Sequence, residues 1–155
     1  MPQIGEKYYR DGAKERLAES MRLFQSDQLA GSVYLAGRAV EGMFRALIWK
    51  SDADYRHGRR SLETGHNLRS LLIVIGNLGL LSDRDDEMRY QVEIVSSQWA
   101  NNMRFVPKRW VESCWRELGV VNKRVTIRLA AANFCDVCSK IIQRCEELYD
   151  ATDNE

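Results

Sequence analysis

The sequence predicts an all-α protein, and we expect an antiparallel bundle of four to five helices. Apolar residues recur at steps of three and four along most of the 155-residue chain, which is the period of an amphipathic helix. No run of β-branched residues alternates as a half-buried strand would. Only two prolines interrupt the pattern. We therefore expect a single helical domain over residues 1–155, with short frayed ends at about 1–5 and 151–155.

Two long helices are expected first, over residues 6–25 and 28–50. Asp27 lies at the break between them and is a candidate N-cap for the second helix. The second helix contains three glycines: Gly31, Gly37 and Gly42. Each of them costs about 1 kcal/mol relative to Ala in a helix interior. We therefore expect another helix to approach closely on this side.

A polar and basic segment follows over residues 51–65, and we expect it to form a loop. Arg59 and Arg60 in this loop are candidates to contact nucleic-acid phosphates. A short apolar helix is expected after it, over residues 66–78.

The fourth helix is expected to begin at Ser82 or Asp83 and to be stopped by Pro107. Its apolar stripe includes Trp99, which we expect in the core or at a dimer interface. The end of this helix is unusual because it contains two amides and a guanidinium: Asn101, Asn102 and Arg104. Their donors must be hydrogen-bonded or left in water. The cluster is therefore either a capping device or a functional site.

A short helix over 109–118 and a long one over about 123–150 complete the expected bundle. Three of the four cysteines lie on roughly one face of the last helix: Cys135, Cys138 and Cys145. We interpret them as buried free thiols. Although Cys135 and Cys138 have the spacing of a metal or redox pair, they lie inside a helix, and no second ligand pair is near in sequence. We expect no metal and no cofactor.

The composition, with 45% hydrophobic and 29% charged residues, is that of a folded globular domain. The chain has 23 basic and 22 acidic side chains, so its net charge indicates no class of partner. The longest apolar run, residues 71–75, is too short to cross a bilayer. The first residues show no basic region followed by an apolar stretch. We expect a cytoplasmic protein with no membrane partner.

Three short motifs, in this order, resemble those of the HEPN family (higher eukaryotes and prokaryotes nucleotide-binding). The first is an apolar helix with an embedded Glu41 and a basic residue, Arg45, four positions later. The second is the turn Gly65-His66-Asn67-Leu68, and the third is the step Asn102-Met103-Arg104-Phe105. The resemblance extends over residues 15–148 and includes the Ala-rich final helix.

Many HEPN members are metal-independent ribonucleases whose signature is an Arg followed, after four to six residues, by a His. Arg104 matches the Arg, but the positions for the His are occupied by Arg109, Trp110 and Val111. A guanidinium stays protonated and can stabilise phosphate charge, whereas RNA cleavage also needs groups that transfer protons. The resemblance therefore implies a catalytically degenerate module.

As the resemblance implies, this module is a homodimer that binds RNA, a nucleotide phosphate or a partner protein such as an antitoxin. The setting would be prokaryotic defence, stress or toxin–antitoxin function. An active ribonuclease that uses Arg104 as its catalytic residue is one alternative, and a purely structural docking bundle is another. The candidate phosphate-binding residues are Asn101, Asn102, Arg104, Arg59, Arg60, Lys108 and Arg109.

Three further residues are expected to orient this site: Glu41, Arg45 and His66. Glu41 either pairs with Arg45 on its own helix or orients the Arg104 guanidinium. His66 is expected to cap and pack the helix that it precedes, and the alternative is that it replaces the missing catalytic His.

Overall fold

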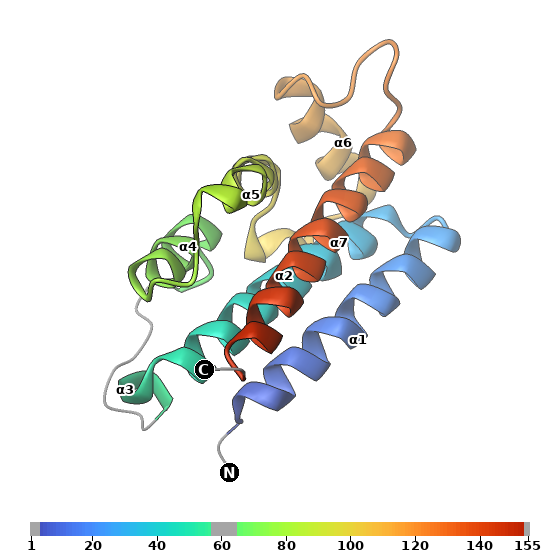
Figure 1. Cartoon of the computed structure of the whole chain (residues 1–155). Helices are drawn as coiled ribbons and strands as arrows, with labels where there is room; N and C mark the ends of the chain where they lie inside the picture. Colours follow the sequence, from blue (N-terminus) through green and yellow to red (C-terminus); the bar gives the residue numbers. More distant parts are fainter. Residues whose placement is uncertain (1–3, 57–64, 154–155) are drawn as a thin grey trace.

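The computed structural model describes residues 4–56 and 65–153, and this part of the chain is helical with no strand (Figure 1). The all-α prediction is confirmed. The elements are α1 (Glu6–Gln25), α2 (Leu29–Ser51), α3 (Ala53–Arg56), α4 (Leu68–Asn77), the 3-10 helix η1 (Asp83–Asp85), α5 (Asp86–Gln98), the 3-10 helix η2 (Asn101–Phe105), α6 (Lys108–Glu117) and α7 (Ile127–Ala151).

α2 is the central helix of the molecule. It is packed between α1 and α7, and α4 covers a further side of it. Its residues are apolar on nearly every face, which is typical of a helix enclosed by others. Figure 1 shows α1, α2 and α7 running alongside one another, with α4 and α5 to one side and α6 beyond the start of α7.

Small residues allow α1 and α2 to pack closely. A Cβ on Gly42 would lie 3.3 Å from the Cβ of Ala13. Further along, Ser20 and Ser32 each donate a hydroxyl hydrogen bond of 2.8 Å to the other's backbone carbonyl. These two contacts set the antiparallel register of the helices. The predicted close approach of a helix at Gly42 is therefore confirmed.

The predicted length of the fourth helix is wrong. It was expected to continue to Pro107, but α5 ends at Gln98 and η2 is a separate element. The backbone of Trp99 is extended, and its indole fills the space beside Gly37, where a Cβ would overlap it. The indole Nε1 donates to the carbonyl of Tyr34 at 3.2 Å. Trp99 is thus buried in the core, as predicted. Pro107 does not end this helix but precedes α6 as its N-cap.

Other parts of the structure also differ from the prediction. Gln28, and not Asp27, is the N-cap of α2, because Asp27 has a left-handed backbone (φ 59°). The segment expected as a loop after α2 contains α3. The last helix begins at Ile127, because the side chain of Asn122 accepts hydrogen bonds from the next backbone amides and forms a turn there.

The prediction of buried free thiols is confirmed for Cys138 and Cys145, whereas Cys135 is free but only half-buried. Cys114 is also free and half-buried. Within the described ranges, no three His, Cys, Asp or Glu side chains are grouped so that they could hold a metal ion. None of the helices there is long and apolar enough to cross a membrane.

Candidate functional site

A buried carboxylate, Glu41, organises the most polar part of the interior. It is 2% exposed and lies in the middle of α2. Its Oε2 is 2.6 Å from Nη1 of Arg38, and its Oε1 is 3.0 Å from Nε of Arg45. The same Oε1 is 2.9 Å from Nδ1 of His66. These partners offset the cost of burying the charge of Glu41. We call Arg38, Glu41, Arg45 and His66 the Glu41 cluster.

The cluster forms because three of its members share one face of α2. Arg38, Glu41 and Arg45 are spaced by three and four residues, so their side chains project to the same side of the helix. The turn before α4 brings His66 to this face. The alternative in which Glu41 pairs with Arg45 is therefore confirmed, and in addition Arg38 and His66 bind the same carboxylate.

Arg45 holds the turn that carries His66. Its Nη2 donates to the carbonyl of Gly65 at 2.6 Å. Gly65 has a left-handed backbone (φ 56°), which suits a residue without a Cβ. Burial is the largest single effect and would lower the pKa of Arg45, but the hydrogen bond and the charge of Glu41, together with Tyr55, outweigh it and raise that pKa. Arg45 is thus a permanently charged structural group.

The contacts of His66 define its tautomer. A carboxylate only accepts hydrogen bonds, so Nδ1 must carry the proton that it shares with Glu41. Nη1 of Arg38, 3.0 Å from the same nitrogen, then makes a close polar contact and not a hydrogen bond. This arrangement leaves Nε2 as the ring nitrogen not used by the cluster. The side chain is 47% exposed, so that nitrogen is available to a ligand.

An open groove of about 750 Å³ lies between α1 and α2, and all four members of the Glu41 cluster line it. Its other side chains include Tyr8, Tyr9, Arg16 and Tyr34. From the register of the two helices, Arg16 lies level with Arg38. Arg16 pairs with Glu19 of its own helix at 3.1 Å, but that pair is solvent-exposed and contributes little. The groove therefore combines guanidinium groups with aromatic rings.

The Asn101–Arg104 cluster, predicted as one site, is divided by the structure. Asn101 joins the Glu41 cluster, because its Oδ1 accepts from Nη1 of Arg38 at 3.4 Å. Asn102 and Arg104 are exposed on η2, and the Arg104 guanidinium lies 4.4 Å above the ring of Phe105. The alternative in which Glu41 orients Arg104 is wrong, because Arg38, Arg45 and His66 occupy that carboxylate.

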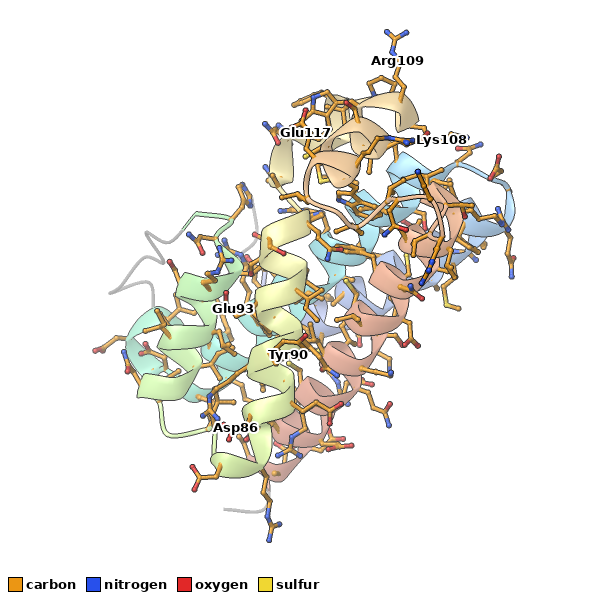
Figure 2. The ribbon with its side chains drawn as sticks, turned by 90° about the horizontal axis from the view of Figure 1, so that it is seen from above. Asp86, Tyr90, Glu93, Lys108, Arg109 and Glu117 are labelled. Atoms are coloured by element: carbon orange, nitrogen blue, oxygen red, sulfur yellow. The ribbon has the colours of Figure 1, made fainter. Side chains whose placement is uncertain are left out.

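The other predicted residues lie in different places. Lys108 and Arg109 are exposed in the first turn of α6, and Figure 2 shows Arg109 directed away from the rest of the molecule. Arg59 and Arg60 fall outside the described residues. His66 does not cap α4, because Asn67 is the N-cap and its side chain accepts from the amide of Ser70 at 3.1 Å.

Sequence reasoning missed Arg38 and Arg16 as site residues. Arg38 had a detectable signal, because it precedes Glu41 by three residues on the same helix face. Arg16 had none, since its place opposite Arg38 depends on the register of α1 against α2.

Comparison of the chain with known protein families, curated proteins and solved structures finds no match. What the site can do chemically is therefore inferred from the geometry of its residues. Guanidinium groups and an imidazole beside an open groove bind anions. His66 is the imidazole among the described residues that line it, and imidazole is the side chain that most often acts as a general acid or base.

Proposed function

We propose that this chain is a HEPN-like helical module that binds the phosphate of RNA or of a nucleotide without cleaving it. The observation that carries the proposal is the buried Glu41, which holds Arg38 and His66 together at the edge of the groove. Both side chains are partly exposed, at 34% and 47%. A ligand would therefore meet donors that are already oriented, which reduces the ordering cost of binding.

The charge and the lining of the groove favour a nucleotide phosphate over a simple anion. Two guanidiniums of the cluster are set against one carboxylate, and a third guanidinium, Arg16 on the α1 side, pairs with Glu15 and Glu19. A planar guanidinium binds phosphate through two parallel hydrogen bonds. The rings of Tyr8 and Tyr34 in the same groove offer surfaces on which a base can stack.

The missing acid–base partner favours binding over cleavage. Cleavage through a 2′-hydroxyl needs one group to take a proton and another to give one. Arg38, Arg45 and Arg16 stay protonated and can do neither. His66 alone would have to serve both steps, and its Nδ1 is already used by Glu41.

The arrangement of the first two motifs supports the HEPN-like part of the proposal, because Glu41 and Arg45 of the first meet His66 of the second. Asn101, which precedes the third motif, reaches Arg38. Asn102 and Arg104 of the third motif itself lie outside the cluster. The homodimer, the partner protein and the defence or toxin–antitoxin setting stay predictions.

The proposal is tested by the affinity of the purified protein for labelled single-stranded RNA, 5′-AMP and inorganic phosphate, at low salt with EDTA. Arg38→Ala should weaken binding about tenfold or more, because a hydrogen bond to a charged group contributes about 1.5–3 kcal/mol. Arg89→Ala is the matched control, since Arg89 is an exposed arginine on α5 that pairs with Asp86. Equal affinity of Arg38→Ala and wild type, with both folded by circular dichroism, would contradict the proposal.

The same samples distinguish the alternatives. Shortening of the RNA in EDTA that is lost in His66→Ala would identify an active ribonuclease that uses His66. Shortening that is lost in Arg104→Ala but kept in His66→Ala would support the predicted Arg104 enzyme. If the wild type neither binds nor cleaves, the purely structural docking bundle is the reading that remains.

A further inference from the structure

The segment around η2 and the start of α6 is free of acidic residues. No Asp or Glu occurs between Glu93 and Glu112, although the chain has 22 acidic residues among 155. The same stretch contains three basic residues: Arg104, Lys108 and Arg109. All three are exposed. This stretch of the chain is therefore basic in a protein whose total charge is nearly balanced, and the next acidic residue on α6, Glu112, pairs with Arg116.

Two large aromatic side chains are exposed in the same segment. Phe105 is 74% exposed and Trp110 is 44% exposed. The core positions of these elements are filled by other residues, Met103 of η2 and Val111 and Trp115 of α6. Phe105 and Trp110 are thus not needed to pack η2 and α6 onto the bundle. Exposed aromatic rings beside cations are typical of surfaces that bind a partner.

The aromatic and basic side chains are neighbours in sequence, within residues 104–110, where η2 is followed by the first turn of α6. We define the η2–α6 surface as Arg104, Phe105, Lys108, Arg109 and Trp110. The Arg104 guanidinium already lies over the Phe105 ring, 4.4 Å from its centre. Such a pair offers a flat face for stacking and a cation beside it.

We propose that the η2–α6 surface binds single-stranded nucleic acid. Bases stack on Phe105 and Trp110, and phosphates contact Arg104, Lys108 and Arg109. Stacking requires the face of a base, which a duplex hides and a single strand exposes. The three exposed cations make the surface complementary to a polyanion. An acidic protein would match the charge, but it would not require two exposed rings.

The inference rests on the proposed function in naming RNA, and it adds a second contact site. Asn101 connects the two sites, because it begins η2 and its side chain reaches Arg38 of the Glu41 cluster. The η2–α6 surface begins at Arg104, three residues after Asn101 in the protein sequence. We therefore expect a nucleic-acid strand with one phosphate bound near Arg38 to continue onto this surface.

The test measures the anisotropy of fluorescein-labelled oligo(U), oligo(dT) and a duplex of the same length, with the full chain in EDTA. Phe105→Ala and Trp110→Ala should each weaken single-strand binding about tenfold, given the contribution of one stacked base. Tyr90→Ala is the matched control, because Tyr90 is 68% exposed on α5, outside the surface (Figure 2). It should bind as the wild type does. The two single strands separate RNA from DNA.

Two further readouts report on the surface itself. Lys108→Gln combined with Arg109→Gln should make the salt dependence shallower by about 1.4 in the slope of log K against log salt. Trp110 is the most exposed of the four tryptophans, since Trp49, Trp99 and Trp115 are buried. Stacking should therefore quench the Trp110 emission, and Trp110→Ala should abolish most of the quenching.

The outcomes separate this inference from the proposed function. If Arg38→Ala loses affinity while Phe105→Ala and Trp110→Ala do not, the η2–α6 surface is refuted and the groove stands. The reverse pattern refutes the groove and supports the surface. Equal binding of duplex and single strand refutes the stacking contacts, and no binding by the wild type refutes both proposals.

Discussion

Replacing Glu41 by Gln tests the central feature of the structure, the buried carboxylate with three charged or polar partners. The substitution keeps the shape but removes the charge. The amide has one accepting oxygen, whereas the carboxylate accepts from Arg45 and His66 at Oε1 and from Arg38 at Oε2. In either orientation, the amide NH₂ faces at least one donor. A partly buried guanidinium then loses its counter-charge.

The expected cost is large because the site is buried. Removing one partner of a buried ion pair typically destabilises a protein by about 3–5 kcal/mol. We expect Glu41→Gln to lower the free energy of unfolding by this amount, measured by urea denaturation followed by circular dichroism. The urea concentration at the midpoint of unfolding should fall, while the slope of the free energy of unfolding against urea concentration stays the same.

A surface ion pair of similar length provides the control. Glu93 accepts from Nε of Arg69 at 2.8 Å, but both side chains are about half exposed. Glu93→Gln should therefore cost less than about 1 kcal/mol. If the two substitutions cost the same, or if Glu41→Gln costs less than about 1 kcal/mol, the argument that burial makes the Glu41 cluster essential is refuted.

Three further predictions concern packing, pH and thiol chemistry. Gly37→Ala should destabilise the protein by about 1–3 kcal/mol, because the new methyl group overlaps the buried indole of Trp99. Gly12→Ala should instead stabilise it by about 0.5–1 kcal/mol, because nothing lies within 4 Å of the added Cβ. Thermal unfolding of the two variants and the wild type measures both effects. Burial would raise the pKa of Asp85, but hydrogen bonds from Arg144 and Ser82 outweigh it and lower that pKa. The resulting stability is complete above the ordinary Asp pKa of about 3.9 and is lost as pH falls through the lower folded value, so Arg144→Met should flatten the acid limb of a stability–pH curve. Burial raises the pKa of Cys138 and Cys145, so a thiol reagent should modify the half-buried Cys114 and Cys135 first in the native protein, and equal rates for all four would contradict this order.

Helix periodicity predicted the long elements well, because α2 and α7 bury many apolar positions and α1 packs partly buried Tyr9, Leu17 and Phe24 against the core. It failed at Trp99, where the apolar stripe continues but the helix ends. The reason is tertiary: the indole occupies the gap beside Gly37, and the Gln98 carbonyl accepts from Nε1 of Trp115. Neither contact has a signal in the local sequence. The prolines did not help either, because Pro107 is equally compatible with a helix stop and a helix start.

The candidate site was predicted in part for the same reason. Glu41, Arg45 and His66 were singled out from short motifs and Asn101 from the polar end of the fourth helix, and the structure brings all four to one place. Their partner Arg38 was missed, although its spacing from Glu41 predicts a contact on one helix face. The expected role of Arg104 depended on its being next to Glu41, and that position is taken by cations from the helix of Glu41 itself.

The two proposed contact sites differ in how their cations are held, and this difference assigns them different parts of binding. Arg38 is fixed by Glu41 and Asn101, so little side-chain freedom is lost when it binds a phosphate. Lys108 and Arg109 are exposed in the first turn of α6, so their contacts are strongly screened by salt. The groove should therefore dominate affinity at high salt, and the η2–α6 surface should dominate the rate of association at low salt. Stopped-flow binding at two salt concentrations would contradict this division if Arg38→Ala reduced the low-salt association rate more than the combined Lys108→Gln and Arg109→Gln variant does.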